Sequence, residues 1–446
     1  MKQLPIEFQE RMKNLLGDEY DDFLKSYDEK PVRAFRVNTD KISLDDFQKL
    51  NIFSNEKIPY VENGFYFDYD GIGNHPYHHA GMFYIQEPAA MVPVESIDIQ
   101  PDWKVLDLCA APGGKSSQIK NKLGEKGVLI SNEIVPSRCK ILTGNMERMG
   151  FKNTVTTCMH PQKLQKEFPE TFDMIMVDAP CSGEGMFRKE EVAIDEWTPE
   201  NVLMCAQRQE EILDCAVKML KQGGYIVYST CTFSLEENEM TVDAFIERHP
   251  EFEIIPVTET VRENTADGVK FDGCKCENIH YTRRCYPHKT KGEGQFVAVL
   301  KDSECNKEYF SVNFGKEKHD KVLIDFLNDT LVEYDERTVQ IYNGNPVYFT
   351  PDFPIRKGCA FSCGVTIGEI RKNYIQPHHQ FFMAMGNDFK RQINLTADSD
   401  EIKKYLHGEE FNTDCENGWA VVMVDGCTVG GVKMSTVVYV SEAIHE

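Results

Sequence analysis

The sequence predicts an α/β protein built on a doubly wound, mainly parallel β-sheet, with smaller domains before and after it. The length is the first observation, because 446 residues exceed what one ordinary hydrophobic core organises, so two to four domains are expected. The second observation is an alternation of apolar strand-like runs with helix-like segments that starts near residue 103. The third is the last apolar run, 295–300, which follows an irregular passage without a clear crossover helix. Such a strand is expected to enter the sheet antiparallel.

The alternation defines the elements of this sheet in chain order. Predicted strands cover residues 104–108, 128–132, 154–158, 172–178, 223–229 and 295–300. Predicted helices cover residues 113–122, 136–149, 199–221 and 235–248. Strands and helices that alternate at this spacing are typical of a parallel sheet with helices on both faces.

The segments before the sheet have a different pattern. Residues 1–30 predict helices with an apolar face, and residues 33–38 predict a short strand. The stretch 60–92 is rich in Tyr, Phe, His and Gly and predicts a looped segment. Together these features favour a small α+β region at the N-terminus.

Beyond about residue 302 the pattern is α+β again. Residues 337–349 predict a hairpin that turns at Asn343-Gly344-Asn345. Residues 417–440 predict a small β-domain that turns at Asp425-Gly426. A domain boundary is therefore expected near residues 302–308.

The composition indicates in which cellular compartment the protein is expected. Hydrophobic residues make up 41% of the chain, yet no apolar run approaches the roughly 18 residues that a membrane-spanning helix needs. The charged, amphipathic N-terminus lacks a signal-peptide core. We therefore expect a cytoplasmic protein with no membrane contact. The fifteen cysteines should stay reduced there, and because their spacing matches no zinc site, no metal is expected.

The formal net charge of −23 counts against a bulk electrostatic grip on nucleic acid. An acidic protein that binds a polyanion has to gather its basic residues locally. The candidate basic patches are Arg33/Arg36, Arg188/Lys189, Arg283/Arg284 with His288/Lys289/Lys291, Arg371/Lys372 and Lys390/Arg391. Runs of charge are more often solvated surfaces, so no single patch indicates a binding site.

The stretch KVLDLCAAPGGKSS, residues 104–117, predicts a strand, a tight turn and a helix start. The small side chains of the turn let a ligand approach the backbone, and its two glycines let main-chain N–H groups point outward at the helix N-terminus. The expected ligand contacts are Asp107, Cys109, Ala110, Ala111, Pro112, Gly113, Gly114 and Lys115.

The stretch 104–117 matches neither of two common nucleotide-binding loop patterns. A phosphate-binding P-loop needs G-x-x-x-x-G-K-[ST], but Cys109 stands where the first glycine is required. The dinucleotide pattern G-x-G-x-x-G is also absent. An adenosyl ligand without a pyrophosphate does not need so open a loop.

Glu133 in ISNEIVPSR, residues 130–138, lies at the next predicted strand end. A carboxylate there can hold both hydroxyls of a ribose. The alternative is that Glu133 stabilises the N-terminus of the helix that starts at Pro136. The turn and Glu133 together indicate S-adenosylmethionine as the ligand, with Arg138 and Asp178 as further expected cofactor contacts.

Two cysteines each follow a predicted buried strand. Cys181 lies in DAPCSGEGMFR, residues 178–188, and Cys231 lies in YSTCTFS, residues 228–234. Ligands of open α/β sheets bind beyond the carboxyl ends of the strands, so both thiols should face one crevice. The alternative is that both are small buried residues of the core. Each has a polar neighbour and a turn signal, which a core residue does not need.

Paired thiols at this place suit covalent chemistry on an electrophilic ring. Carbon 5 of cytosine is a poor nucleophile, but a thiolate added to carbon 6 makes it an enamine that can attack a methyl sulfonium. The reaction needs an activated cysteine, a partner for ring N3 and the exocyclic amine, and a base for the C5 proton. Asp178 precedes Cys181 closely and could face N3.

These motifs resemble those of the RNA cytosine-C5 methyltransferases of the Nop/Sun family. The segments that carry the resemblance are RVNT (36–39), YIQEPAAM (84–91), DLCAAPGGK (107–115), DAPCSGEGMFR (178–188), YSTCTFS (228–234) and YPHKTKGEGQF (286–296). The resemblance covers most of residues 1–302. It implies a class I methyltransferase fold, which is Rossmann-like, and S-adenosylmethionine as methyl donor.

The resemblance also implies roles for the site residues. Cys231 would be the nucleophile, Cys181 would assist release of the enzyme–RNA adduct, and Asp178 with Lys115 would contact the base. In DNA cytosine methyltransferases the nucleophile is instead the cysteine after a proline, here Cys181, so no DNA substrate is expected.

The chain departs from the family pattern at two places. The acidic residue that the family often has near the adenine is absent from the segment 157–160, which reads Thr-Cys-Met-His. Gln295 stands where the family usually has a histidine.

The tail beyond residue 305 resembles the bacterial ribosomal RNA branch of the family, and Lys433 matches the pattern of its PUA-like RNA-binding domain. The domains expected are an N-terminal RNA-binding domain (1–75), the methyltransferase domain (76–302), a linking domain (305–370) and the PUA-like domain (371–446). The implied target is 16S ribosomal RNA, with transfer RNA as the alternative, for an enzyme that acts as a monomer. A catalytically silent RNA-binding factor is the alternative from another class; two reactive thiols count against it.

Overall fold

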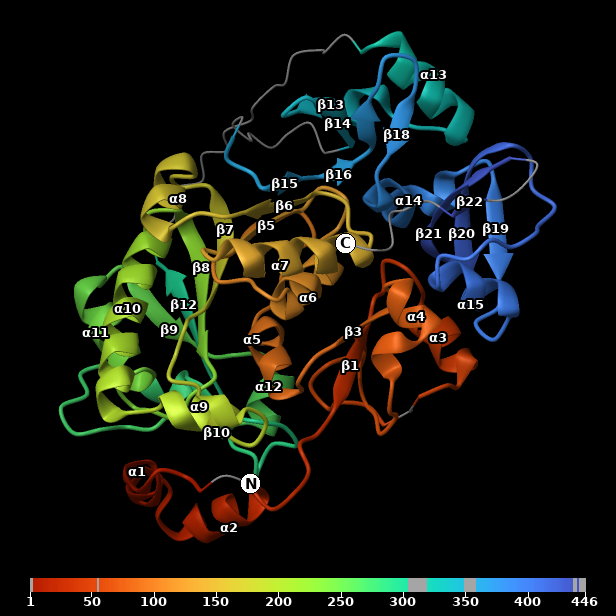
Figure 1. Ribbon diagram of the computed structural model, residues 1–446. Helices are drawn as coiled ribbons and strands as arrows, with labels where there is room; N and C mark the ends of the chain where they lie inside the picture. The colour runs from red at the N-terminus through yellow and green to blue at the C-terminus, as the bar shows by residue number, and fades with distance from the viewer. Residues whose placement is uncertain (1–2, 54–55, 304–318, 349–357, 436–438, 441–446) are drawn as a thin grey trace.

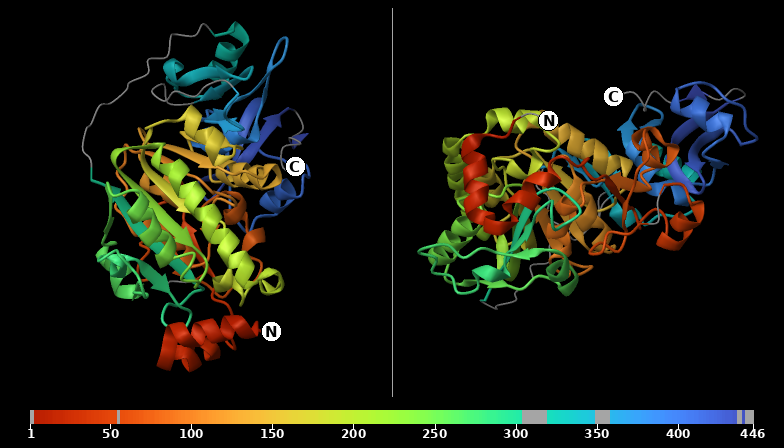
Figure 2. Two further views of the ribbon diagram at one scale, coloured as in Figure 1. Left: turned by 90° about the vertical axis from the view of Figure 1, so that its left-hand side faces the viewer. Right: turned by 90° about the horizontal axis from the view of Figure 1, so that it is seen from below.

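The computed structural model describes residues 3–53, 56–303, 319–348, 358–435 and 439–440. A large sheet covered by helices forms the centre of the molecule (Figure 1). Two views agree that helices α1 (Ile6–Leu16) and α2 (Tyr20–Ser26) lie at one end and α13 (Lys321–Thr330) at the other (Figures 1 and 2). Among the described helices, none combines the length and apolar character needed to cross a membrane.

The central sheet is mixed, in the strand order β10-β11-β12-β8-β7-β4-β5-β6-β15, with β9 paired to β12. The five strands from β8 to β6 are mutually parallel, and β12 runs antiparallel to β8 with Phe296 opposite Thr230. This confirms the predicted doubly wound sheet with an antiparallel last strand. The strands are β4 (Lys104–Asp107), β5 (Val128–Asn132), β6 (Thr154–Thr157), β7 (Phe172–Asp178), β8 (Leu220–Thr230), β9 (Phe252–Ile255), β10 (Ala266–Asp267), β11 (Arg283–Cys285), β12 (Gln295–Asp302) and β15 (Ser362–Cys363).

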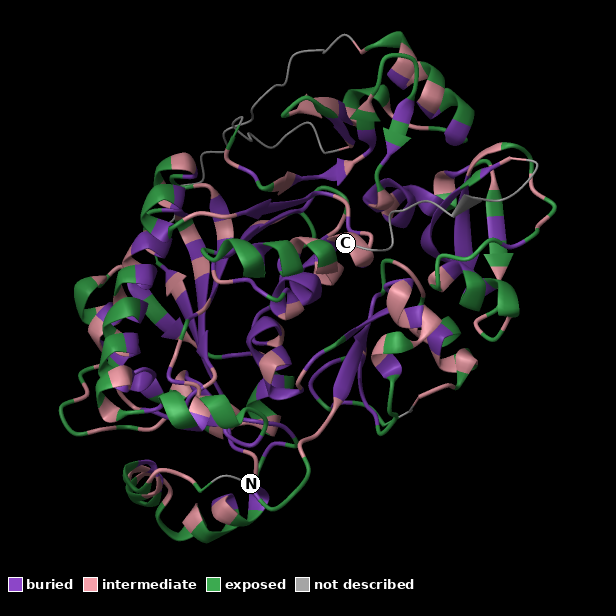
Figure 3. Ribbon diagram, viewed as in Figure 1, coloured by how far each residue is buried: buried purple, intermediate pink, exposed green. Residues whose placement is uncertain are grey.

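Helices cover both faces of this sheet, and the buried side chains form a separate cluster on each face. One layer contains α5 (Val92–Glu95), α6 (Gly114–Lys122), α7 (Pro136–Arg148) and α12 (Glu259–Asn264). The opposite layer contains α8 (Pro161–Glu167), α10 (Pro199–Val217) and α11 (Glu239–Arg248). The central strands are apolar throughout because both of their faces are covered, as the buried band in Figure 3 shows.

Two predicted helix boundaries are wrong. The helix predicted over 199–221 ends at Val217, and β8 begins at Leu220 because that buried side chain pairs with Phe172 of β7. The helix predicted from residue 235 begins at Glu239. The residues before it form a turn in which the Asn238 N–H donates to the Leu235 carbonyl.

The N-terminal region contains more strand than the sequence predicts. The predicted strand is β1 (Ala34–Val37), and it is the centre of a three-stranded sheet with β2 (Gly64–Tyr66) and β3 (Phe83–Ile85). Both partners come from the stretch predicted as loop. The strands are too short to show a period in the sequence, and their pairing with β1 is a tertiary interaction. The helices here are α3 (Leu44–Leu50) and α4 (Pro76–His79).

The C-terminal part contains the two predicted hairpins. In each of them the two turn residues have positive φ, Asn343 with Gly344 and Asp425 with Gly426, as two-residue hairpin turns require. The elements are β13 (Val339–Tyr342), β14 (Asn345–Tyr348), β16 (Val365–Thr366), β17 (Gly368–Ile370), β18 (Ile375–Pro377), α14 (His379–Met385), β19 (Gln392–Leu395), α15 (Asp400–Leu406), β20 (Gly418–Val424), β21 (Cys427–Met434) and β22 (Tyr439–Val440).

The predicted boundary near 302–308 extends into residues outside the described ones, which end at Ser303 before this gap. On its far side, β15 joins the edge of the central sheet by pairing with β6. The C-terminal part also shares a hydrophobic cluster with the N-terminal region, in which Phe35 and Phe47 belong with Ile393 and Tyr405.

Most arginines of the predicted basic patches are buried. Arg188 forms an ion pair with Glu293 at 3.0 Å, and Arg284 pairs with Glu239, all four side chains being nearly inaccessible. Arg36 is also fully buried and donates to the Gln86 side chain. These arginines hold the fold together and are not a surface for a polyanion.

Candidate active site

The ends of β7 and β8 bring the two predicted catalytic cysteines together. β7 ends at Asp178 shortly before Cys181, and β8 ends at Thr230 directly before Cys231. The two sulfur atoms lie 3.2 Å apart. Both thiols can therefore reach one ring placed beyond the carboxyl ends of these strands.

Lys115 and Asp178 form an ion pair beside the thiols, with Nζ 2.8 Å from Oδ2. The other carboxylate oxygen of Asp178 accepts a hydrogen bond from Ser229 Oγ at 2.7 Å. Burial opposes the charge of Lys115, but the Asp178 carboxylate outweighs burial and raises the pKa of the lysine. The ammonium group is therefore charged at neutral pH and fixes the orientation of the carboxylate.

The Cys181 thiol keeps its proton. Its hydrogen bond with Cys231 and its burial raise the pKa of Cys181 well above the usual range. Two thiolates at a separation of 3.2 Å would repel each other, so at most one of the pair ionises.

The turn after β4 presents a buried carboxylate with a free acceptor. Asp107 Oδ2 accepts a hydrogen bond from Ser116 Oγ at 2.6 Å, whereas Oδ1 is buried without a partner among the described residues. Burial raises the pKa of Asp107 to about 7. It also raises the pKa of Cys109 far above its usual range, so that thiol is uncharged at neutral pH.

The backbone of this turn is held from both sides. The Ala110 N–H donates to the Asn132 carbonyl at 2.8 Å, and Arg138 Nη2 donates to the Ala111 carbonyl at 2.9 Å. Gly113 has a φ of +112°, a conformation that favours glycine, and leads directly into α6. Helix α6 therefore begins at Gly114, directly after this turn. Its first turn lies close to Asp107, which accepts a hydrogen bond from Ser116 Oγ.

Glu133 lies just beyond β5 and is buried. Its Oε1 accepts the Val135 N–H at 2.9 Å, and its Oε2 lies 3.2 Å from Arg138 Nη1. The carboxylate therefore does contact the segment that leads into α7, as the helix-stabilising alternative expects. Each of its oxygens still has a lone pair for a ligand hydroxyl.

These residues fit S-adenosylmethionine. The unpartnered Asp107 oxygen can accept a hydrogen bond from the ammonium group of the methionine part, and the N-terminus of α6 favours its carboxylate. Glu133 is placed for the ribose hydroxyls on the neighbouring strand. In the part of the chain that the structure describes, no group of three His, Cys, Asp or Glu side chains could hold a metal ion.

Sequence reasoning missed a buried polar network behind the cysteines. Glu237 accepts hydrogen bonds from Ser182 and Gln209, and Glu184 accepts them from Trp197 and Phe233. Gln209 is fully buried and also donates to the Pro180 carbonyl. Glu184 stands between two glycines and Glu237 follows another glutamate, so the sequence gives no signal that either side chain is buried.

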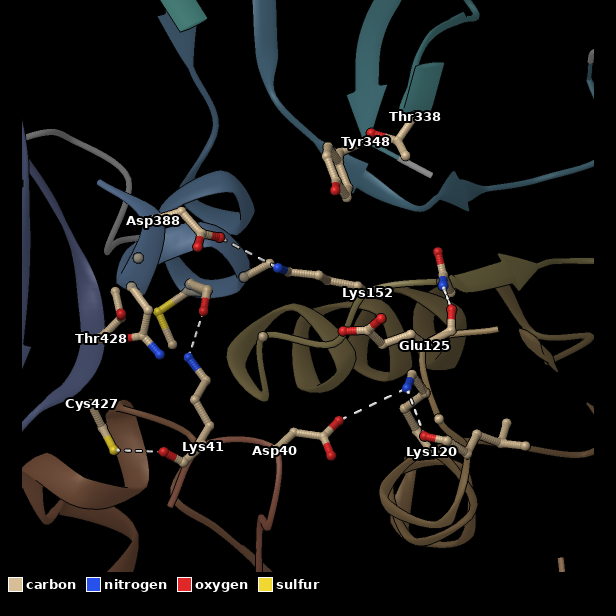
Figure 4. A pocket seen from close by; sticks show the side chains of 18 of the residues that line it. Asp40, Lys41, Lys120, Glu125, Lys152, Thr338, Tyr348, Asp388, Cys427 and Thr428 are labelled. Atoms are coloured by element: carbon tan, nitrogen blue, oxygen red, sulfur yellow. Dashed lines mark hydrogen bonds and ion pairs between the residues drawn. The ribbon is translucent and has the colours of Figure 1, made fainter. Parts of the chain in front are cut away.

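Two cavities of the structure lie away from this site. One, of about 560 Å³, is bounded by Lys41 and by residues of α6, α14 and β21, and Figure 4 shows Lys41, Lys120 and Lys152 directed into it. The other, of about 1360 Å³, lies at the amino ends of β4 and β8. Among the described residues that line them, none belongs to the predicted site.

The fold and the site together define a class I methyltransferase that depends on S-adenosylmethionine. Strand β12 runs antiparallel beside β8, the turn after β4 has a buried carboxylate oxygen without a partner among the described residues, and two thiols lie 3.2 Å apart just beyond β7 and β8. Comparisons with known proteins identify the family more closely.

Residues 94–301 match the family model described as 16S rRNA methyltransferase RsmB/F. Residues 4–88 match the N-terminal domain of 16S rRNA methyltransferase RsmF, and residues 392–438 match the methyltransferase RsmF PUA domain. The chain therefore belongs to the RsmB/F methyltransferase family, and S-adenosylmethionine is its methyl donor.

Curated relatives carry the name ribosomal RNA small subunit methyltransferase F. One from Vibrio vulnificus (strain YJ016) is 30% identical over 455 residues, which cover 96% of this chain and 94% of the relative. One from Klebsiella pneumoniae (strain 342) is 37% identical over 294 residues, which cover 63% of this chain and 60% of the relative. The chain thus spans about 60% of that second relative.

Solved structures agree with the fold. A methyltransferase homolog protein from Pyrococcus horikoshii has a TM-score of 0.58 at 28% identity, over 66% of this chain and 94% of that chain. The NSun6 structure from Pyrococcus horikoshii has a TM-score of 0.56 over 68% of this chain and 99% of that chain. Its 22% identity supports a common fold alone.

Proposed function

We propose that this protein methylates carbon 5 of a cytosine in 16S ribosomal RNA. The observation that carries the proposal is the 3.2 Å approach of two thiols beside the Lys115–Asp178 ion pair. The names of the curated relatives favour ribosomal RNA over transfer RNA. The target cytosine has to leave its stack to reach the thiols, as for other enzymes that act on a base.

The Cys231 thiolate adds to carbon 6 of the ring, which makes carbon 5 nucleophilic. As carbon 6 is attacked, ring N3 takes up the proton that the Cys231 thiol gives up. The Asp178 carboxylate accepts hydrogen bonds from N3–H and from the exocyclic amine, and Lys115 fixes this carboxylate from the other side. Cys231 is assigned this role from the resemblance of its motif YSTCTFS to the Nop/Sun family, and the retained proton of the Cys181 thiol is consistent with it. S-adenosylmethionine supplies the electrophilic methyl group.

Cys181 first loses its own proton to solvent and then, as a thiolate, removes the proton from carbon 5. The bond between carbon 6 and the Cys231 sulfur breaks as the ring double bond returns, and Cys231 leaves as a thiolate. The strongest influence that keeps Cys181 protonated is Cys231 itself. Once Cys231 is bonded to the ring, it is a neutral thioether and this influence is gone. Cys181 therefore becomes a better base at the stage at which a base is needed.

The cofactor would be held by the turn 107–115, in which Asp107 binds the methionine ammonium group. Glu133 would bind the ribose, and Arg138 supports both by its contacts with Glu133 and the Ala111 carbonyl. Adenine recognition would rest on backbone groups near 157–160, where the acidic residue is absent.

The remaining assignments are proposals too. The chain would act in the cytoplasm as a monomer, with domains at 1–75, 76–302, 305–370 and 371–446, of which the first and last bind RNA. The match to a PUA domain model supports the last of these. Light scattering of the purified protein should give the mass of a single chain.

Substitution of each cysteine tests the roles. Cys231→Ala should abolish transfer of a tritiated methyl group to 16S ribosomal RNA, because no other group can activate carbon 5. Cys181→Ala should accumulate a covalent protein–RNA adduct that survives a denaturing gel, because the adduct forms but cannot resolve. Full activity of the Cys231 variant, or an adduct in that variant, would reverse the assignment, and unmethylated RNA from wild-type protein would reject the function.

A further inference from the structure

Two buried carboxylates tie the loops of Cys181 and Cys231 to each other. Glu237 follows Cys231 in the chain and accepts hydrogen bonds from the other loop, from Ser182 N–H at 2.9 Å and Ser182 Oγ at 2.5 Å. Glu184 follows Cys181 and accepts the Phe233 N–H at 3.0 Å. Each loop therefore supplies the acceptor for a main-chain donor of the other loop.

The two carboxylates are anchored behind the loops as well. Gln209 of α10 donates to Glu237 Oε1 at 2.9 Å, and Trp197 Nε1 donates to Glu184 Oε1 at 2.9 Å. Gln209 of helix α10 and Trp197, shortly before that helix, thus hold the two carboxylates, and the carboxylates hold the loops. A main-chain hydrogen bond from Gly185 N–H to the Cys231 carbonyl at 2.9 Å closes the same junction.

Both side chains are almost fully buried, with exposures of 1% for Glu184 and 0% for Glu237. Burying a carboxylate is costly even when it is hydrogen-bonded, and burial raises the pKa of Glu237 to about 7. An apolar pair would fill the same space at a lower cost. What apolar side chains cannot supply is a directional bond to a specific main-chain N–H.

We propose that Glu184 and Glu237 are positioning residues, which hold the Cys181 and Cys231 sulfurs at the separation that lets both act on one cytosine. The proposal rests on the function proposed above. Among the described residues, no hydrogen bond joins either carboxylate to the Cys181 or Cys231 sulfur. The carboxylates act through Ser182 and Phe233, which lie next to Cys181 and close after Cys231 in the chain.

The variants Glu184→Gln and Glu237→Gln of the full chain test the proposal, because glutamine keeps the volume and replaces an acceptor oxygen by a donor. The matched control is Asp243→Asn on α11. Asp243 is also a buried carboxylate and accepts the main-chain N–H groups of Lys275 and Cys276, at 3.0 and 2.7 Å, away from the cysteine loops.

The first readout needs no RNA. Diamide, a diazene oxidant, takes two electrons and two protons from the Cys181 and Cys231 thiols, which gives a disulfide and a hydrazine. Mass spectrometry of the linked peptides measures the rate. We expect wild type and Asp243→Asn to form this disulfide at the same rate. Both glutamine variants should form it at about one tenth of that rate or below. Equal rates in folded glutamine variants would refute the proposal.

The second readout is methyl transfer. Both glutamine variants should lose about 10- to 100-fold in kcat, with the KM for RNA and the Kd for S-adenosylmethionine changed by less than about threefold. A loss confined to KM would refute a positioning role. If either glutamine variant fails to fold by circular dichroism, Ser182→Ala removes the Oγ bonds to Glu237 and Thr232, leaves the main-chain bond in place, and should shift both readouts in the same direction. If wild type methylates no RNA, the proposed function fails, and the disulfide rates still decide whether the carboxylates position the thiols.

Discussion

Asp107 is a single carboxyl group of the proposed cofactor site, and the fold controls its protonation. Burial raises its pKa to about 7, and its Oδ1 has no partner among the described residues. The native state therefore binds a proton more readily than the unfolded chain does. The stability due to this proton is present at low pH and is lost as the pH rises from about 4 to about 7.

Cofactor binding should show the opposite dependence on pH. In the proposed site the methionine ammonium group needs the ionised form of Asp107. The Kd for S-adenosylmethionine should therefore be about tenfold higher at pH 6 than at pH 8. Isothermal titration calorimetry at both pH values measures it. Asp107→Asn should bind weakly at both, with no such change. An unchanged wild-type Kd would remove Asp107 from the cofactor site.

At the scale of elements, the loop of Cys181 is packed backbone to backbone against its neighbours. A Cβ added at Gly185 would lie 2.7 Å from both the Gly294 Cα and its carbonyl oxygen, and 2.9 Å from the Cys231 carbonyl oxygen. Main-chain atoms of this kind cannot move aside as a flexible side chain would. The short 3-10 turn Glu184–Met186, β12 and the end of β8 therefore meet only because residue 185 lacks a side chain.

Gly185→Ala should accordingly destabilise the protein by about 1–3 kcal/mol and lower methyl transfer, since the cysteine loop must shift. Urea denaturation followed by tritium incorporation measures both effects. Gly73→Ala is the matched control, because a Cβ there meets no atom within 4 Å. A Gly185 variant as stable and active as the control would show that the loop has room to adjust.

The whole molecule is joined across long sequence distances. Tyr77 of α4 donates to Asp425 Oδ2 in the β20–β21 turn at 2.7 Å, and Lys41 Nζ donates to the Met383 carbonyl of α14 at 2.5 Å. The N-terminal region and the C-terminal sheet share one hydrophobic cluster. The first and last parts of the chain therefore stabilise each other.

Deletion of residues 371–446 should thus do more than remove an RNA-binding part. The shared cluster loses one side, so we expect a lower melting temperature and increased binding of the dye ANS. Calorimetry and dye fluorescence measure these changes. If the shortened chain melts like wild type and binds no dye, the two ends fold independently.

The sequence by itself determined the class of fold and predicted which residues gather at the strand ends. Apolar runs such as 128–132 are buried on both faces, and strand–helix alternation allows few topologies, so the sheet followed from pattern alone. The chemistry of the site also followed from motifs, because a turn of small residues and a cysteine at a strand end are local features. Glu133, Asp178, Cys181 and Cys231 could therefore be named without the structure.

Only the tertiary structure decided which charges are available and how the thiols are held. Arg36, Arg188 and Arg284 resemble surface cations in the sequence, but they pair inside the protein. Glu184 and Glu237 bind main-chain donors that are distant in the sequence. Local sequence fixes the period and the turn of each element, whereas the partner of a buried polar group depends on which segments the fold brings together.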